Sequence, residues 1–400
     1  MTETAQVQAR HARGGLVRRI LWYAALAAAG VAGFVLVYGN TVVDQLDSAY
    51  HAQDVRALVG DRPERAGAGT DGPLTILVMG SDVRDGGNLK VGGGSDVQGM
   101  RNDTTMLVHV SADRSRVEAV SIPRDAQVEI PACTYLDGST VPGTTGDFNI
   151  AFSHGGARGS AAEAAACTIK TVEQMTGVYI DHYAVVDFTG FIDMVDAIGG
   201  VPMCIPERLV SSKAHLDLRP GPQVLDGTTA LAYARLRTAE QGGVSGSDLQ
   251  RITRQQQMLE QVARTVLSKN LLTDVGELTQ FIRAGAESLT MDTELADTSS
   301  LLALAYSVRG LDARDIAFET VPWAYTEDRL NVRILPEAEQ MWDDMRNDRP
   351  ISVTAEGDAS SAWDDGKKDE TTSSPKPSET AEPAGSSSAT SLEDLLGACR

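Results

Sequence analysis

The sequence predicts a layered α/β or α+β domain in which helices cover both faces of a sheet. Short apolar runs alternate along the chain with segments whose apolar residues have helical spacing, and this alternation is typical of a sheet covered by helices. The domain is expected over residues 73–350. A long apolar run and a connector precede it, and a segment with few large apolar residues follows it.

Strands are expected where short apolar runs are bounded by glycine, proline or polar residues. The predicted strands are 74–80 (LTILVMG), 105–110 (TMLVHV), 117–122 (VEAVSI), 182–188 (HYAVVDF), the YARLR segment at 233–237, and 316–322 (IAFETVP). In YARLR, a period of two would place Tyr233, Arg235 and Arg237 on one face of an extended chain.

Helices are expected between several of these strands. They are predicted at 160–175, 190–198, 247–267 and 298–311, with a last amphipathic segment ending near Asn347. Ser247 and Gln250 form a plausible capping box for the third of them. Arg251, Arg254 and Gln255 would then share one face of that helix.

Residues 20–38 predict a single transmembrane helix, because this uncharged apolar run has roughly the 20 residues needed to cross the hydrocarbon core. Arginines are frequent in residues 1–19, and Asp44 and Asp47 follow the run. The positive-inside rule therefore predicts a cytoplasmic arm at 1–19 and an extracytoplasmic domain, in a single-pass protein of the cell membrane. A signal peptide cleaved near Ala27–Ala29 is the alternative.

Two segments flank the domain. Residues 39–72 are predicted to be a connector, and residues 351–400 form an acidic tail rich in serine, threonine and proline. Such a tail cannot bury enough apolar surface to offset chain entropy, so we expect it to be disordered. The sequence assigns it no chemistry, and it does not indicate the oligomeric state.

Four cysteines lie on the predicted outer side of the membrane, where disulfides persist. They are Cys133, Cys167, Cys204 and Cys399, and their spacing fits no metal site. Three pairings are possible and the sequence does not choose among them, although Cys133 with Cys167 is favoured.

Arginines recur in short blocks beside predicted strand ends and turns, although the formal net charge is −20. The blocks are GSDVRDG (80–86), RNDTT (101–105), SIPRD (121–125), YARLR (233–237) and RITRQQ (251–256). Planar guanidinium groups suit phosphate oxygens, and open α/β sheets place ligand-binding groups at strand ends. The sequence therefore predicts an anion site, with a pyrophosphate as the expected ligand.

Each block also has a purely structural interpretation. SIPRD can be a strand-terminating turn with a surface salt bridge, the arginines of YARLR can be neutralised by Glu240, and 251–256 can be a solvated helix start. Asp82 and Asp103 can cap turns. They can also bind Mg²⁺, since magnesium takes one or two carboxylates and completes its coordination with water and substrate phosphate.

Several classes of site are disfavoured. The glycine-rich stretch 91–99 is no phosphate loop, because the chain contains no GxxxxGK[ST] motif, and no other nucleotide-binding fingerprint is present. No HExxH motif and no Ser/His/Asp arrangement is visible, so His154 and His182 are expected to be structural. The negative charge disfavours nucleic acid.

Taken together and in this order, the blocks resemble the LytR–CpsA–Psr family of cell-wall ligases. The resemblance runs from about Leu74 to Leu267 and includes FNIAFSHGG (148–156), AIGGV (197–201) and LRPGPQVLDGTTALAYARLR (218–237). It implies a three-layer α-β-α domain with a mixed central sheet, a hydrophobic groove for a polyprenyl chain and an arginine-rich mouth for the pyrophosphate. It also implies transfer of a glycopolymer from a polyprenyl-pyrophosphate donor to peptidoglycan.

The resemblance assigns roles to particular residues. Arg101, Arg124, Arg235, Arg237 and Gln255 would hold pyrophosphate oxygens, and Asp82 and Asp103 would bind or orient Mg²⁺. The catalytic group would consist of Arg124, Arg101, Asp103 and Asp82. Arg84, Asp125, Arg251 and Arg254 match family positions less decisively.

Several points stay open at the level of sequence. The Gly- and Ser-rich stretch between Arg237 and Asp248 is longer than the family pattern and predicts an enlarged loop beside the mouth. Asp82, Asp103 and Asp125 are candidates for the general base, and the motifs do not identify the glycopolymer. A non-catalytic or regulatory protein that binds polyprenyl pyrophosphate is the alternative function, and a structural envelope protein is a third.

Overall fold

A computed structural model describes most of the predicted domain. It covers residues 51–67, 72–82, 100–242, 244, 248–268, 280–281, 283–285, 288–328 and 330–352. The predicted cytoplasmic arm and transmembrane helix lie outside these residues, as do the tail from residue 353, parts of the connector, Arg84 and the capping Ser247. Within the described ranges, no helix has both the length and the apolar character that crossing a membrane requires.

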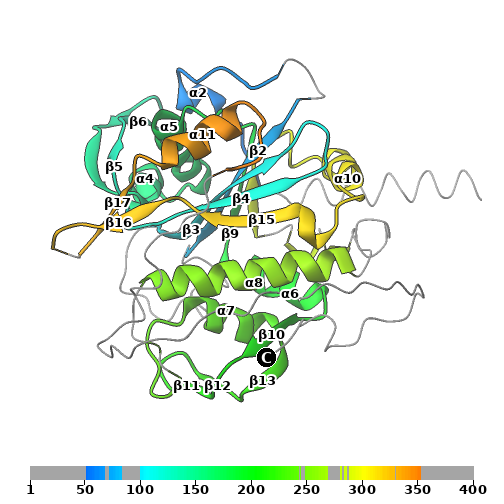
Figure 1. The fold of residues 1–400 in the computed structure, drawn as a ribbon. Coiled ribbons are helices and arrows are strands. Elements are labelled where there is room, and N and C mark those ends of the chain that lie inside the picture. The colour runs from blue at the N-terminus through cyan, green and yellow to red at the C-terminus, as the bar shows by residue number, and fades with distance from the viewer. Residues whose placement is uncertain are drawn as a thin grey trace, which may run out of the picture. The chain divides into compact units, whose positions relative to one another are not determined.

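A mixed sheet forms the centre of the described domain, with the strand order β1-β14-β9-β2-β3-β4-β15 (Figure 1). The strands are β1 (His51–Ala52), β14 (Leu289–Met291), β9 (His182–Val186), β2 (Leu74–Ser81), β3 (Asn102–Val110), β4 (Val117–Ile122) and β15 (Ile316–Thr320). The β2, β3 and β4 strands pair antiparallel, whereas β9 runs parallel to β2 and β15 parallel to β4. The expected mixed sheet is confirmed, and β2, β3, β4, β9 and β15 lie where the apolar runs predicted them, whereas β1 and β14 were not predicted.

One face of the sheet packs against helices of the larger hydrophobic core. These elements are α2 (Arg56–Val59), α4 (Asn149–Gly155), the short 3₁₀ helix η1 (Gly156–Arg158), α5 (Ala161–Thr176) and α11 (Ala338–Arg346). The Ser160 side chain caps α5 by accepting from the Glu163 N–H, as its sequence predicts. A Cβ at Gly155 would lie 2.3 Å from the Glu163 carbonyl oxygen, so glycine is needed where α4 meets α5.

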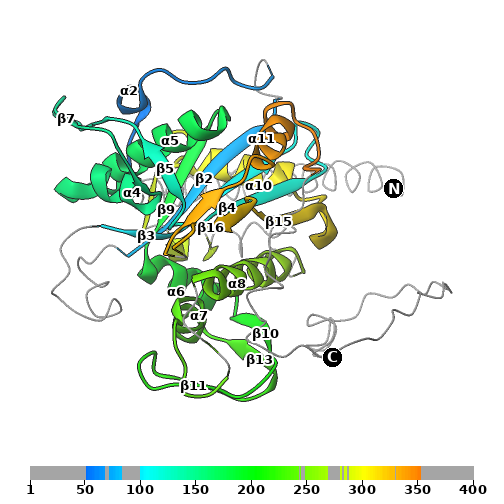
Figure 2. The ribbon, with the colours of Figure 1, turned by 60° about the vertical axis from the view of Figure 1, so that its left-hand side comes forward.

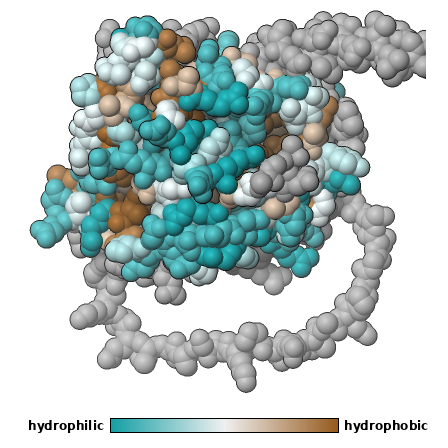
Figure 3. Space-filling model, turned by 90° about the horizontal axis from the view of Figure 1, so that it is seen from above, coloured by the Kyte–Doolittle hydropathy of each residue, from teal (hydrophilic) through white to brown (hydrophobic). Residues whose placement is uncertain are grey.

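The disulfide between Cys133 and Cys167 joins strand β6 (Cys133–Thr134) to α5. This confirms the favoured cysteine pairing. Nearby lie the hairpins β5–β8 (Gln127–Ile130 and Thr144–Asp147) and β6–β7, where β7 is Thr140–Val141. The face seen in Figure 3 is mainly hydrophilic, with hydrophobic residues in small separate patches, because the large apolar side chains of α11, Met341 and Trp342, are buried.

A second hydrophobic core lies beyond helix α8 (Asp248–Ser268), which runs beside the sheet (Figures 1 and 2). It is formed by α6 (Phe188–Ala197), α7 (Gly227–Arg235), and the antiparallel pairs β10–β13 (Val201–Ile205 and Gly221–Leu225) and β11–β12 (Leu209–Ser211 and Leu216–Leu218). Gln256 of α8 donates to the Glu319 carbonyl of β15 at 3.1 Å. The expected flanking helices are therefore present, and α8 joins the sheet to the second core.

The prediction of a strand at YARLR is wrong. Tyr233 and Arg235 belong to α7, whose Asp226 cap accepts from the Thr229 N–H at 2.8 Å. The helical signal begins upstream of the alternating residues, at Asp226 and the buried Ala230 and Leu231. Residues two apart on a helix point about 200° from each other, so Tyr233 is buried in the second core while Arg235 lies half-exposed.

The remaining elements complete the far end of the sequence. They are α10 (Thr298–Ser307), the 3₁₀ helix η2 (Ala313–Asp315) and the hairpin of β16 (Trp323–Tyr325) and β17 (Val332–Ile334). The helices expected at 298–311 and before Asn347 are confirmed as α10 and α11.

Candidate functional site

Three strand ends meet at one edge of the central sheet. The pairing of β2 with β3 places Ser81 opposite Asn102, and the pairing of β3 with β4 places Thr105 opposite Ile122. The residues that follow β2, begin β3 and follow β4 therefore gather at the same edge. The predicted site residues there are Asp82, Arg101, Asp103, Arg124 and Asp125.

The turn after β4 fixes the position of Arg124. Its backbone is held by the Ala126 N–H, which donates to the Pro123 carbonyl at 3.1 Å, and by the Asn149 N–H of α4, which donates to the Arg124 carbonyl at 3.0 Å. From this turn, Arg124 Nη1 donates to Asp103 Oδ1 at 2.6 Å, and its Nε lies 3.2 Å from Asp125 Oδ1. A proline that ends the strand thus leads into an arginine directed at the neighbouring strand.

Helix α8 brings a second arginine to the same carboxylate. Arg251 is only 1% exposed, and its Nη1 lies 3.3 Å from Asp103 Oδ1. One turn later, Gln255 accepts from the Thr104 hydroxyl at 3.0 Å and donates to the Ala234 carbonyl at 3.3 Å. Gln255 therefore joins β3 to the end of α7.

Further arginines lie at the carboxyl end of α7 or contact it from α8. The Arg235 guanidinium lies over the Phe188 ring, 4.1 Å from its centroid, which holds the side chain by a cation–π contact. Arg254 is largely buried and donates to the Leu236 carbonyl. The adjacent Arg237 is exposed to solvent. We call Arg101, Arg124, Arg235, Arg237, Arg251 and Arg254 the arginine cluster.

The charge of the cluster acts on Asp103. Burial alone would raise the pKa of Asp103, but the guanidinium groups of Arg251, Arg124 and Arg237 outweigh burial and hold that pKa below its usual value. Asp103 is consequently ionised at neutral pH. Three carboxylates, Asp82, Asp103 and Asp125, accompany the six arginines, so the site carries a positive excess that suits an anion.

Asp82 has a structural contact as well. Its Oδ1 accepts from the Arg101 N–H at 2.8 Å, and its own N–H donates to the Arg101 carbonyl at 2.9 Å. These bonds fix both residues at the sheet edge. Among the described residues, no group of three or more metal-ligating side chains occurs, which leaves a site of two carboxylates plus ligand oxygens as the arrangement to consider for Mg²⁺.

A pocket opens beside the cluster. It contains about 1010 Å³ of empty space, part of it open to solvent, and it is lined by residues that include Met100, Ser160, Val185 and Asp187. Met100 precedes Arg101 and Asp187 precedes Phe188, so the pocket adjoins the site. Its lining is both polar and apolar, and the hydrophobic groove for a polyprenyl chain stays a prediction.

Most of the predicted site residues lie at this one edge. Arg84 lies outside the described residues, and sequence reasoning missed Thr104 and Phe188. Thr104 lies inside RNDTT and could have been included as a polar neighbour of Asp103. Phe188 gives no signal, because its partner Arg235 is distant in sequence and the contact depends on the packing of α6 against α7.

Comparison with known proteins identifies the relatives of this fold and site. The model of the LytR_cpsA_psr family matches residues 36–347. The chain belongs to the LytR–CpsA–Psr family. The match covers every described element from β1 to α11, including each residue of the arginine cluster.

Individual relatives of this LytR–CpsA–Psr protein support the same assignment. This chain is 33% identical over 278 residues to the probable cell wall biosynthesis protein LcpB of Corynebacterium glutamicum, and the alignment covers 68% of this chain and 60% of LcpB. It is 30% identical to the cell wall biosynthesis protein LcpA of that organism, with 66% of this chain and 53% of LcpA covered. The alignments thus include less than two thirds of each relative. A polyisoprenyl-teichoic acid–peptidoglycan teichoic acid transferase, TagU of Enterococcus faecalis, is 29% identical, covering 58% and 66%.

Solved structures share the fold of this LytR–CpsA–Psr protein. Bacillus subtilis TagV aligns with a TM-score of 0.52 at 22% identity, covering 70% of this chain and all of TagV. A LytR-Csp2A-Psr enzyme of Actinomyces oris aligns with a TM-score of 0.51 at 20% identity, covering 74% and 96%. The central sheet and its flanking helices are therefore those of the family.

Proposed function

We propose that this protein is a phosphotransferase that moves a glycopolymer from a polyprenyl-pyrophosphate carrier onto peptidoglycan. One observation carries the proposal: guanidinium groups from β4 and α8 converge on the Asp103 carboxylate, and Arg237 adds its charge there. The names of TagU and of the corynebacterial relatives give independent support, because they refer to teichoic acid transfer and to cell wall biosynthesis.

The charges of the site suit the chemistry of this reaction. A hydroxyl oxygen of peptidoglycan would attack the phosphorus that carries the glycopolymer, and the bond from that phosphorus to the bridging oxygen would break. Polyprenyl phosphate would leave with that oxygen and its electron pair, and the hydroxyl proton would pass to a base. Negative charge grows on the leaving and equatorial oxygens, so arginines placed in advance would stabilise the transition state.

Different arginines suit different parts of this task. Arg251 is buried and Arg124 is mostly so, and both donate toward Asp103, which makes them suited to hold the pyrophosphate itself. Arg237 and Arg101 are exposed and suit the entering donor. Arg254 donates to the Leu236 carbonyl and Gln255 to the Ala234 carbonyl. These two side chains therefore position the arginines at the end of α7.

Asp82 and Asp103 are the residues that would hold Mg²⁺. Asp82 directly follows β2, and Asp103 lies near the start of the antiparallel strand β3, so both are at the same edge. Magnesium needs only one or two carboxylates when phosphate oxygens complete its coordination. The ion would neutralise phosphate charge when bound. Asp103 Oδ1 already accepts a hydrogen bond from Arg124. When the ion and the donor bind, the Asp103 carboxylate would therefore interact with both the metal and the guanidinium group.

We place the domain outside the cytoplasmic membrane, anchored by residues 20–38. The disulfide between Cys133 and Cys167 supports this location, because disulfides persist in oxidising compartments. It also fits the chemistry, since a reaction driven by a pyrophosphate bond in the donor needs no nucleotide.

The first test uses the full chain in detergent with Mg²⁺, a polyprenyl-pyrophosphate-linked glycopolymer and peptidoglycan. We expect transfer, and we expect Arg124→Ala to slow it by at least about tenfold, the scale of one charged contact. Arg208→Ala is the matched control, because Arg208 is an exposed arginine paired with Asp217 in the second core region. Retention of the lipid without transfer would indicate a non-catalytic carrier-binding protein instead.

A further inference from the structure

The hairpin of β16 and β17 is attached directly to the turn that carries Arg124. The Val332 N–H donates to the Asp125 carbonyl at 3.2 Å, and Val332 forms a parallel bridge with Ala126. Tyr325 is paired with Val332 across the hairpin. With two strand spacings between them, the Tyr325 and Ala126 backbones lie about 10 Å apart. Tyr325 is thus close to the arginine cluster, although some 200 residues separate it from Arg124 in sequence.

Apolar side chains on this hairpin remain exposed. Tyr325 is 39% exposed, and Leu330 in the turn is 77% exposed. Trp323, only 8% exposed, lies with its ring centroid 5.3 Å from that of Tyr325 and nearly perpendicular to it. The core residue Trp323 therefore holds the Tyr325 ring in place, while the exposed part of the ring is available to a partner.

Hydrogen bonds join the described residues of the turn between the strands. The Thr326 N–H donates to the Asn331 carbonyl at 2.9 Å, the Thr326 hydroxyl donates to Asp328 Oδ1 at 2.6 Å, and the Leu330 N–H donates to the same oxygen at 3.1 Å. A binding element that is already ordered loses little entropy when it binds. The exposed Leu330 is therefore presented on a preformed turn.

The charges of the hairpin indicate which partner fits. Two acids, Glu327 and Asp328, and two arginines, Arg329 and Arg333, occur in the sequence of the hairpin, so its formal charge is zero. It therefore offers no net attraction to an anionic lipid surface or to the phosphates of a donor. The donor pyrophosphate would also be drawn to the arginine cluster. An uncharged sugar ring fits better, because its C–H face packs on an aromatic ring while its hydroxyl groups face water or the turn.

We propose that the β16–β17 hairpin is the subsite for the glycan strand of the acceptor, with Tyr325 as its stacking platform. This inference rests on the proposed function, since it identifies which substrate approaches from the hairpin side. The subsite would hold the strand so that one of its hydroxyl groups reaches the phosphorus held by the arginines. It takes a sugar chain, and it contributes no group to the chemical step.

The experiment measures binding and turnover separately, with the full chain in detergent. Calorimetric titration with a soluble, uncrosslinked peptidoglycan strand should show Tyr325→Ala binding about tenfold more weakly than the parent, the effect of one lost aromatic contact. Tyr325→Phe keeps the ring and should bind like the parent. Tyr306→Ala is the matched control, because Tyr306 is 61% exposed on α10, across the sheet from the hairpin in Figure 1.

In the transfer assay, Tyr325→Ala should raise the acceptor KM by the same factor and leave kcat and the donor KM unchanged. Equal glycan affinity of the parent and Tyr325→Ala would overturn the subsite, even if transfer proceeds. Absence of transfer in the parent would instead count against the proposed function, and the calorimetry would still report on the hairpin. If Tyr325→Ala slowed reaction only with a vesicle-embedded donor and not with a short-chain soluble donor, the hairpin would contact the membrane and the subsite would be wrong.

Discussion

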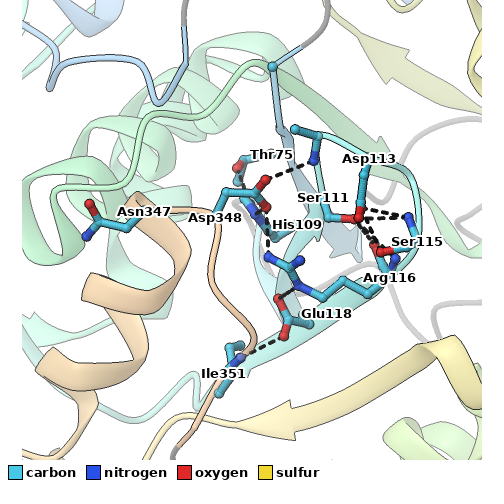
Figure 4. A network of polar contacts seen from close by, with 12 residues as sticks. Thr75, His109, Ser111, Asp113, Ser115, Arg116, Glu118, Asn347, Asp348 and Ile351 are labelled. Carbon is cyan, nitrogen blue, oxygen red and sulfur yellow. Dashed lines mark hydrogen bonds and ion pairs between the residues drawn. The ribbon is translucent and has the colours of Figure 1, made fainter.

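A network of charged residues lies at each end of strand β3, and the two networks differ in their balance of positive and negative charge. At one end, Asp103 lies among the arginine cluster. At the other end, His109 belongs to a network with Thr75, Arg116, Glu118 and Asp348, which we call the histidine network (Figure 4). His109 lies six positions after Asp103, about 20 Å along a strand.

In the histidine network, a carboxylate accompanies each positive group. Arg116 Nη2 lies 2.8 Å from Asp348 and its Nε 3.4 Å from Glu118. Asp348 also accepts from the Ala112 N–H at 3.0 Å and contacts His109 Nε2 at 3.1 Å, and Glu118 accepts from the Ile351 N–H at 2.7 Å. These contacts attach the segment after α11 to β3 and β4.

The comparison shows how the same residue types can serve structure or binding. In the histidine network, the carboxylates receive backbone and side-chain donors from both segments, so their charges are satisfied within the fold. In the arginine cluster, arginines outnumber carboxylates, and under the proposed function the excess charge would bind the donor phosphates. We therefore expect substitutions at the first end to change stability and substitutions at the second to change activity.

The largest effect is expected for Arg251→Met, which removes a buried guanidinium that contacts Asp103. Transfer should slow by on the order of 100-fold, as for the loss of one preorganised donor in an active site. Arg116→Met makes the same change in the histidine network and should lower the melting temperature with little effect on kcat/KM. If Arg251→Met lowered stability alone, both ends of β3 would be structural and the comparison would fail.

An intermediate effect is expected for Asp348→Asn. Asp348 has a φ of 50°, and asparagine tolerates this left-handed conformation, so the substitution removes charge without adding backbone strain. Arg116 and His109 would lose an ionised partner, and the free energy of unfolding should fall by about 2 kcal/mol. Urea unfolding measures this, and Asp217→Asn, at an exposed ion pair, should change it far less. Unchanged stability would show that the histidine network is dispensable.

The smallest effect concerns pH. Burial lowers the pKa of His109 despite the opposing contact with Asp348, so the unfolded chain takes up a proton more readily below about pH 6.5, the ordinary histidine value. Stability should therefore decrease as pH falls below that value. His109→Gln should remove this part of the acid dependence, as measured by urea unfolding between pH 5 and pH 7.5.

His182 provides a control of opposite sign. Burial would lower its pKa, but the hydrogen bond and charge of Asp292 outweigh burial and raise that pKa. The stability it contributes is present below the ordinary histidine value and is lost as pH rises through the raised pKa. His182→Gln should therefore change the neutral-to-alkaline side of the profile. If both variants changed the acid side alike, these directions would be wrong.

Local patterns in the sequence determined most of the elements. The apolar run 117–122 became β4 with the same bounds, and Ser160 began the helix predicted at 160–175, because strand alternation and helix caps are set by neighbouring residues. The recurrence of arginine in a chain of net charge −20 likewise indicated an anion site. The same local reasoning failed at YARLR, because residues 233–235 form the last turn of a helix that is capped by Asp226, and only Leu236 and Arg237 lie beyond it.

Tertiary structure alone decided which of these residues meet. Thr104 and Gln255 are 151 positions apart, and Arg251 reaches Asp103 only because α8 runs beside the sheet edge where β2, β3 and β4 end. Strand register and helix packing set such contacts, and neither is encoded within a short window of sequence. The composition could therefore indicate a positive site in this protein, but only the fold could place Arg116 in the histidine network and Arg251 beside Asp103.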